Sequence, residues 1–179
     1  MNYKIVFILL LSILQLQAQT DKKTRKAKKA TTTKKVTNAG ATEMENPFVW
    51  HTDMNKAVAL SNKLKKPMLL FFTGSDWCGW CIRLQKEVLK TPEFEAWAKK
   101  NVVLVELDFP RRTPQLPEIQ KQNAELQQGF QIQGFPTIYF VNAEMKDGKV
   151  NFAPIDKTGY VAGGPAAWLA VADGILAKK

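Results

Sequence analysis

The sequence predicts an α/β protein in which a mixed central β-sheet lies between two layers of helices, a three-layer sandwich. Segments with strand and helix patterns alternate along the chain, which is typical of this class. The apolar run at residues 68–72 is continuous, as expected of a central strand that is covered on both faces. Two further strand patterns, at residues 137–142 and 150–152, predict a hairpin. The Asp147-Gly148 pair between them suits the positive φ angles of a tight turn.

We expect the domain to begin with a short edge strand at residues 47–50 and a helix that ends near Lys65. Thr52 or Asp53 can cap this helix, because a short polar side chain accepts hydrogen bonds from the first backbone N–H groups. Its inward-facing residues recur at helical spacing: Met54, Ala57, Val58, Ser61 and Leu64. Pro67 then starts the central strand.

A second helix is predicted directly after the two cysteines, continuing to about residue 90 with Leu84 and Val88 on its buried side. Residues 91–93 (Thr-Pro-Glu) start a third helix, because they place a capping residue, a proline at the first helical position and an acid in the first turn. The residues expected on its buried face are Phe94 and Trp97.

A strand at residues 102–107 leads into a segment at residues 110–117 that is rich in proline and arginine. We expect this segment to be a plain surface loop rather than a rim around a functional site. Helical patterns follow at residues 117–128 and 165–176. The residues that these two helices are expected to bury are Ile119, Leu126, Trp168, Ala172 and Ile175.

The two cysteines of the chain, Cys78 and Cys81, lie between the central strand and the second helix. At such a junction, unpaired backbone N–H groups and the positive end of the helix dipole stabilise a thiolate. We therefore expect Cys78 to be a nucleophile. Cys81 lies one helical turn further on and can attack a mixed disulfide on Cys78, which makes it the resolving cysteine.

Two other roles for the cysteines are less well supported by the chemistry. A structural disulfide that closes so short a loop removes little entropy from the unfolded chain. A zinc site needs two more ligands, and His51, the single histidine, has no partner at ligand spacing. We expect no metal site and no cofactor.

Two separated motifs resemble the thioredoxin superfamily. The first is WCGWC at residues 77–81, after an apolar strand, and the second is GFPT at residues 134–137, before another. The longer stretch at residues 72–81 is similar to exported thioredoxin-like proteins of bacteria. The resemblance covers residues 47–176, and it implies a thioredoxin-like three-layer sandwich for a domain at residues 46–179.

The resemblance also implies further site residues. Pro136 is expected to follow a cis peptide bond and to pack beside the cysteine pair. The backbone of Phe135 would then be exposed and could pair with an extended client segment. Trp77, Gly79 and Trp80, which flank the nucleophile, complete the expected substrate-binding residues.

The chain departs from the best-known thioredoxins at two positions. Phe72 stands where those proteins carry a buried aspartate, six residues before the first cysteine, so another group must accept the proton of the resolving thiol. Asp76, Glu106 and Asp108 are the candidates, and the sequence does not rank them. Trp80 replaces the proline between the cysteines, which changes the start of the helix.

The N-terminal residues carry the patterns of an export signal and a linker. Residues 1–18 are typical of a signal peptide, because Lys4 precedes a ten-residue apolar run at residues 5–14 and Ala18 suits cleavage. An uncleaved anchor is the alternative, although the run is short for a membrane span. Residues 19–45 lack apolar periodicity and are expected to be a basic, disordered linker. We expect a periplasmic or secreted protein.

Much of the positive charge of the chain lies in this linker. Residues 19–45 contain eight basic and three acidic side chains, which account for half of the net charge of +10. The rest of the chain is only mildly basic, so the high pI is weak support for nucleic-acid binding and we expect no nucleic-acid partner.

Together these patterns predict an enzyme, an exported thiol-disulfide oxidoreductase with a CGWC dithiol that reduces or isomerises disulfide-containing client proteins. We expect a monomer that is recycled by a redox partner which the sequence does not identify. Two alternatives stay open. One is a redox-inactive, peptide-binding module with a structural disulfide, and the other is a reductant for a single client such as an apocytochrome.

Overall fold

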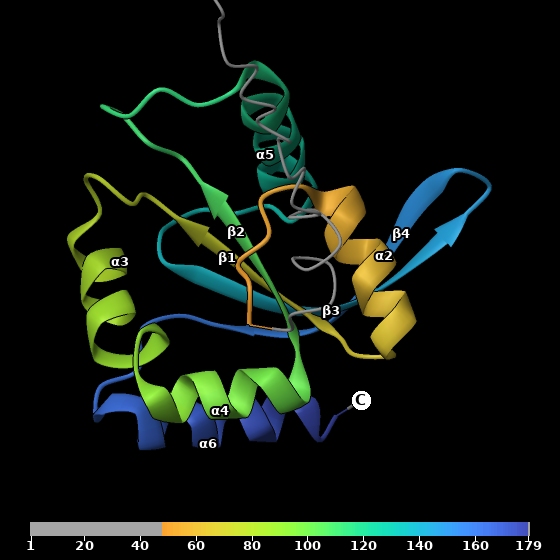
Figure 1. Cartoon of the computed structure of the whole chain (residues 1–179). Coiled ribbons are helices and arrows are strands. Elements are labelled where there is room, and N and C mark those ends of the chain that lie inside the picture. The colour runs from red at the N-terminus through yellow and green to blue at the C-terminus, as the bar shows by residue number, and fades with distance from the viewer. Residues whose placement is uncertain (1–47, 179) are drawn as a thin grey trace, which may run out of the picture. The chain divides into compact units, whose positions relative to one another are not determined.

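A computed structural model describes residues 48–178, and in it a four-stranded mixed sheet lies between two layers of helices (Figure 1). The strand order is β2-β1-β3-β4: β1 (Met68–Thr73) runs parallel to β2 (Val103–Asp108) and antiparallel to β3 (Thr137–Lys146). Strand β4 (Lys149–Thr158) forms the predicted hairpin with β3. The predicted three-layer α/β class is confirmed. The predicted signal peptide and linker lie outside the described residues.

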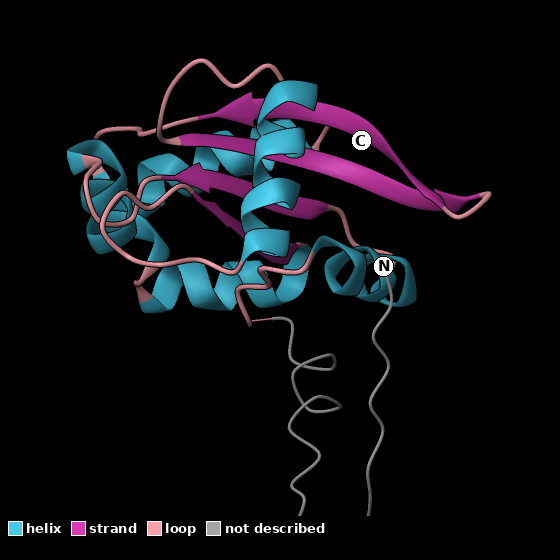
Figure 2. Cartoon of the chain, turned by 90° about the horizontal axis from the view of Figure 1, so that it is seen from above, coloured by secondary structure: helices cyan, strands magenta, loops and turns pink. Residues whose placement is uncertain are grey.

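The helices divide between the two faces of the sheet. They are α2 (Met54–Leu64), α3 (Gly79–Leu84), the π-helical segment η1 (Gln85–Leu89), α4 (Pro92–Asn101), α5 (Pro117–Gly129) and α6 (Gly164–Leu176). Helices α2 and α5 cover one face, whereas α3, η1, α4 and α6 cover the other (Figure 2). None of these helices has the length and apolar character that a bilayer span requires.

Helix boundaries follow local capping chemistry. The Asp53 carboxylate accepts hydrogen bonds from two N–H groups in the first turn of α2, and the Thr91 hydroxyl accepts one in the first turn of α4. Pro92 follows Thr91 at the start of α4, where a missing N–H costs nothing. The start of α4 is therefore confirmed as predicted, and Asp53 rather than Thr52 is the cap of α2.

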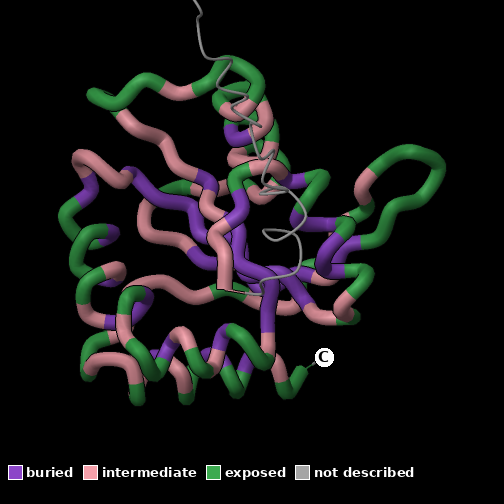
Figure 3. Tube along the Cα trace, viewed as in Figure 1, coloured by how far each residue is buried: buried purple, intermediate pink, exposed green. Residues whose placement is uncertain are grey.

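Strand β1 is buried on both faces, and the buried residues of the chain concentrate along the sheet (Figure 3). Leu69 and Phe71 belong to the core beneath α3, α4 and α6, while Leu70 and Phe72 belong to the core beneath α2 and α5. Because neither face meets solvent, the strand is continuously apolar, as the sequence indicated.

Trp168 on α6 joins the helices on the cysteine side to the sheet. Its fully buried ring lies 5.7 Å from the ring of Phe94, 6.1 Å from that of Trp97 and 6.4 Å from that of Phe140, measured between centroids. Its indole N–H donates to the carbonyl oxygen of Gly159 at 3.0 Å. One side chain thus connects α4, α6, β3 and the segment before α6.

The prediction of an edge strand at residues 47–50 is wrong, because the described part of this range, residues 48–50, forms no strand. Instead, His51 makes a single parallel bridge to Val105 on β2. Its N–H donates to the carbonyl of Leu104 and its carbonyl accepts from the N–H of Glu106, both at 2.9 Å. The contact stops there because Asp53, two residues later, already caps α2.

The burial expected for α5 is also wrong. Ile119 and Leu126 are only half-buried, and they line a cavity of about 710 Å³ between α2, α5 and β4. The buried residue of the helix is Asn123, whose side-chain amide donates to the carbonyl of Asp108 at 2.9 Å. Helix α5 is therefore attached to the end of β2 partly by a polar contact that apolar periodicity does not reveal.

Replacing Trp168 with alanine should lower the free energy of unfolding by about 3–5 kcal/mol, because it leaves a large cavity between α4, α6 and the sheet. Denaturant titration of the oxidised protein measures this loss. Val171→Ala, at a 38% exposed position of the same helix, is the matched control and should change stability by less than about 0.5 kcal/mol. A loss below about 1 kcal/mol for Trp168→Ala would contradict the assigned role.

Candidate functional site

Cys78 and Cys81 are joined by a disulfide where the turn after β1 enters α3. Cys78 is the N-cap residue of α3, and its sulfur accepts a hydrogen bond from the backbone N–H of Cys81 at 3.2 Å. The same N–H can stabilise negative charge on the Cys78 sulfur after reduction. Cys78 is 6% exposed and Cys81 is fully buried, so Cys78 is the more accessible of the pair.

Gly74 shapes the turn that presents the cysteines. Its carbonyl accepts hydrogen bonds from the N–H groups of Trp77 and Cys78, at 3.3 and 2.9 Å. A Cβ atom at position 74 would lie 2.4 Å from Cε2 of the Trp77 indole, a separation that real side chains do not adopt. Glycine is therefore required here for the Trp77 ring to lie over the start of the turn.

Asp76 connects this turn to the β2–α5 loop, residues 109–116. Its carboxylate accepts hydrogen bonds from three successive backbone N–H groups, those of Arg111 at 3.0 Å, Arg112 at 2.7 Å and Thr113 at 3.0 Å. These bonds, with that from Arg111 having the largest effect, hold the pKa of Asp76 below its usual value. The expectation of a plain surface loop is wrong, because the loop borders the disulfide turn.

Trp77 is enclosed by the same loop and by Phe135. Its indole N–H donates to the carbonyl of Phe109 at 2.8 Å. The ring of Phe135 lies edge-on to Trp77 at 5.8 Å and 5.2 Å from the ring of Phe109. On its exposed side, Trp77 carries the guanidinium of Arg111 at 3.7 Å from the ring centroid. The residue before Cys78 is thus held by two segments that are distant in the sequence.

The segment that contains Pro136 approaches the site through Phe135. The Phe135–Pro136 peptide bond is cis, and the Thr137 hydroxyl donates to the carbonyl of Gly134 at 2.8 Å. Gly159 packs closely against this segment, since a Cβ atom at position 159 would lie 3.2 Å from the carbonyl oxygen of Pro136. Both Phe135 and Pro136 remain partly exposed next to the cysteine turn.

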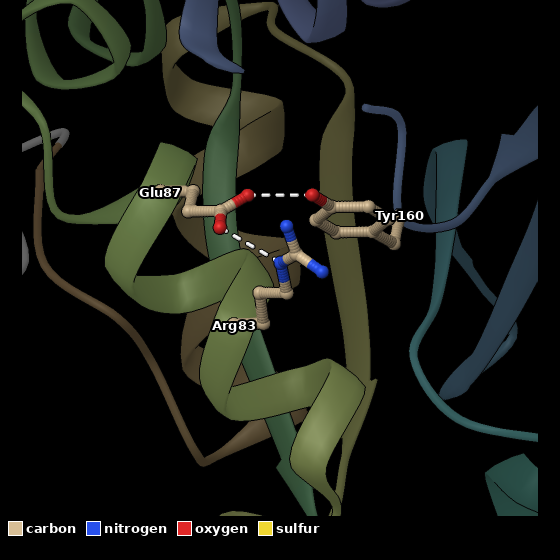
Figure 4. A network of polar contacts seen from close by, with 3 residues as sticks. All are labelled: Arg83, Glu87 and Tyr160. Carbon is tan, nitrogen blue, oxygen red and sulfur yellow. Dashed lines mark hydrogen bonds and ion pairs between the residues drawn. The ribbon is translucent and has the colours of Figure 1, made fainter. Parts of the chain in front are cut away.

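Trp80 lies between the two cysteines in the sequence and is 55% exposed. Its ring is 5.2 Å from that of Tyr160, and the guanidinium of Arg83 lies 5.5 Å and 5.2 Å from the two rings. Glu87 accepts from the Tyr160 hydroxyl at 2.5 Å and from Arg83 at 2.7 Å (Figure 4). The bond from Tyr160, followed by that from Arg83, lowers the pKa of Glu87.

Phe72 does not face the disulfide. Its ring packs on the far side of the sheet, 5.8 Å from the ring of Phe130 and 6.4 Å from that of Tyr139. Of the three carboxyls considered in its place, Asp108 uses both oxygens to accept from the N–H and the hydroxyl of Ser75, at 2.8 and 2.6 Å.

Glu106 has a different environment from the other two acids. It pairs with Phe71 across β1 and β2, on the face that also carries the disulfide, and it is partly buried. Burial, and then the charge of Asp108, raise the pKa of Glu106, while Lys90 lowers it less. Glu106 lines a cavity of about 250 Å³ together with Gln85, whose backbone N–H donates to the carbonyl of Cys81.

The structure brings Trp77, Cys78, Cys81, Phe135 and Pro136 into one region, with Gly79 and Trp80 exposed at its edge. The contributions of the β2–α5 loop and of Tyr160 were not predicted, because both come from segments without a sequence motif. Within residues 48–178, no three His, Cys, Asp or Glu side chains are grouped to hold a metal ion.

Comparison with known proteins places this geometry in a family. A family model described as thioredoxin-like matches residues 49–143, more than half of the chain. A disulfide bond reductase of Chlamydia pneumoniae, DsbH, is 38% identical over 114 residues, 64% of either chain. The thioredoxin-related protein DsbJ of the same organism is 35% identical over 100 residues, 56% of this chain and 29% of DsbJ.

A solved structure of a DsbH oxidoreductase is similar over 73% of this chain and 85% of that one, with a TM-score of 0.65 and 32% identity. The chain spans less than two thirds of the length of either curated relative. The matched family model covers the β1–α3 turn with its cysteine pair. The chain belongs to the thioredoxin-like family.

Proposed function

We propose that the protein is an exported thiol-disulfide oxidoreductase that reduces or isomerises disulfides in client proteins. The observation that carries the proposal is the Cys78–Cys81 disulfide at the start of α3, with the Cys81 N–H directed at the Cys78 sulfur. The names of its relatives, a disulfide bond reductase and a thioredoxin-related protein, support the same chemistry. Export rests on the signal-peptide pattern of residues 1–18.

The reaction proceeds through two exchanges. The Cys78 thiolate attacks a client disulfide and forms a mixed disulfide, and the displaced client sulfur leaves as a thiolate that takes a proton from solvent. The Cys81 thiol then loses its proton, and its sulfur attacks the Cys78 sulfur and releases the second client thiolate. Two electrons pass to the client while the Cys78/Cys81 dithiol becomes a disulfide, which a separate dithiol donor must reduce again.

Glu106 is the carboxyl best suited to accept the proton of Cys81. Asp76 is occupied by backbone N–H groups, which stabilise its charged form and make it a weak base. Asp108 is occupied by Ser75. Glu106 has a raised pKa, and it lies on the disulfide side of the sheet beside the helical turn that follows Cys81.

Cys81→Ser should trap client proteins as mixed disulfides on Cys78, because serine keeps the size of the resolving residue but cannot attack the intermediate. Non-reducing gels and mass spectrometry of envelope extracts identify the trapped adducts. Cys78→Ser is the matched control and should trap nothing.

Capture by Cys81→Ser that does not exceed the Cys78→Ser control, with the protein folded, would contradict the oxidoreductase function. A redox-inactive binding module would then explain the site better. Trapping of one predominant client instead of many would favour a client-specific reductant.

Glu106→Gln should slow the second exchange by about tenfold or more near neutral pH, because the amide cannot accept the Cys81 proton. Single-turnover release of client thiol across a pH series measures this step. The rate at which Cys78 is alkylated should stay unchanged, which separates proton transfer from a general disturbance of the site. An unaltered pH profile of release would exclude Glu106 as the acceptor.

The same variant changes how stability depends on pH. The raised pKa of Glu106 means that the folded protein holds this proton at pH values where the unfolded chain has lost it. Wild-type stability therefore falls as pH rises from the unfolded pKa to the folded pKa. Denaturant titrations should show Glu106→Gln without this fall, so that it gains stability relative to wild type across that window. A difference independent of pH would contradict the raised pKa.

A further inference from the structure

Arg111 holds a cation directly over the residue that precedes Cys78. Its guanidinium carbon lies 3.7 Å from the centroid of the Trp77 ring, while the residue as a whole is exposed. A planar guanidinium that stacks on an aromatic ring uses one face for the ring and keeps its N–H edges free. The contact therefore orients Arg111 over Trp77 without consuming its hydrogen-bond donors.

The described residues provide no carboxylate partner for this guanidinium. The ion pairs found within residues 48–178 do not include Arg111. Asp76, the acid that contacts the same loop, directs its oxygens to the backbone N–H groups of Arg111, Arg112 and Thr113. The negative charge of Asp76 thus shapes the loop, and the side chain of Arg111 stays available to a partner.

The position of Arg111 is determined by several contacts rather than by one. Asp76 fixes its backbone, and the indole N–H of Trp77 fixes the carbonyl of Phe109 two residues earlier. The rings of Phe109 and Trp77 both pack on Phe135. An anion held by Arg111 would consequently lie beside Trp77, the residue that precedes Cys78.

We propose that Arg111 binds a carboxylate next to the reacting cysteine of a client, so that the protein prefers disulfides flanked by Asp or Glu. The inference rests on the proposed exchange reaction, because it requires a client bonded to Cys78. A guanidinium can donate two parallel hydrogen bonds to one carboxylate. The stack on Trp77 orders the side chain in advance, which reduces the conformational entropy lost when a client binds.

Two disulfide-containing peptides test the preference. They are identical except for a Glu or a Gln beside one cysteine, and the second-order rate constant for their reduction by the reduced protein is measured at low salt. Wild type should reduce the Glu peptide about 1.5- to fivefold faster, the range expected for an exposed charged contact. High salt should diminish this ratio, because exposed charges are screened.

Variants then separate Arg111 from the general charge of the loop. Arg111→Gln should bring the ratio of the two rates close to one. Arg112→Gln removes the same charge from the neighbouring residue, and it should keep most of the ratio because no stack on Trp77 is lost. An equal loss in both variants would show a diffuse charge effect and overturn the proposal.

Asp76→Ala distinguishes the positioning of Arg111 by Asp76 from the effect of the negative charge of Asp76. The substitution removes a negative charge near two arginines, so charge alone would raise the preference for the Glu peptide. If the Asp76 bonds hold Arg111 in place, their loss should lower the preference instead. A raised preference would contradict a positioned guanidinium.

The remaining outcomes are also decisive. Equal rates for both peptides with wild-type protein would overturn the role of Arg111 while leaving the exchange reaction intact. A parallel drop of both rates in Arg111→Gln, with the ratio retained, would show that Arg111 only covers Trp77 and would overturn the proposal. Failure to reduce either peptide would contradict the oxidoreductase function itself. The proposed preference for acidic clients, which depends on that function, would then also be overturned.

Discussion

The burial of β1 on both faces is the constraint on which the site depends. A strand with no solvent face must lie between two helical layers, so the chain that leaves its end has to turn sharply at the edge of the sheet. Gly74 permits that turn, and α3 begins immediately after Cys78. Cys78 is consequently presented at a helix start, while Cys81 is carried one turn into the core.

Three acids, one in this turn and two on β2, have chemically different environments. Backbone N–H groups keep Asp76 charged and turn it into an anchor for the β2–α5 loop. Asp108 is bound to Ser75 and stabilises the end of β2 against the turn. Burial makes Glu106 a stronger base than an exposed glutamate. Residues of the same chemical type thus differ in their hydrogen-bond partners and in their burial.

Local patterns were sufficient for most of the helices and strands and for the cysteine pair. The continuous apolar run predicted β1, and the capping residues Asp53 and Thr91 predicted the starts of α2 and α4. These features depend on a few neighbouring residues, so they can be read from the chain directly. The WCGWC and GFPT motifs also indicated the family, since each combines a strand with a turn of defined chemistry.

Long-range contacts could not be read in the same way. The sequence marks Asp76 as an acid near the cysteines, but its partners are backbone N–H groups 35 to 37 residues later. Backbone donors carry no residue signature, so neither the anchored loop nor the stack of Arg111 on Trp77 was foreseeable. The burial predicted for Ile119 and Leu126 was wrong for a different reason. Apolar spacing shows that a helix has an apolar face, but it does not show whether that face contacts the sheet or lines a cavity.

Selective alkylation of the reduced protein tests most directly whether the β1–α3 turn activates one thiol. Reduced protein is treated with iodoacetamide between pH 6 and pH 7, and the labelled peptides are identified by mass spectrometry. Cys78 should react first, because its sulfur accepts the Cys81 N–H at the helix start and is the more exposed of the two. Preferential labelling of Cys81 would contradict the assigned roles and the electrostatic reason given for them.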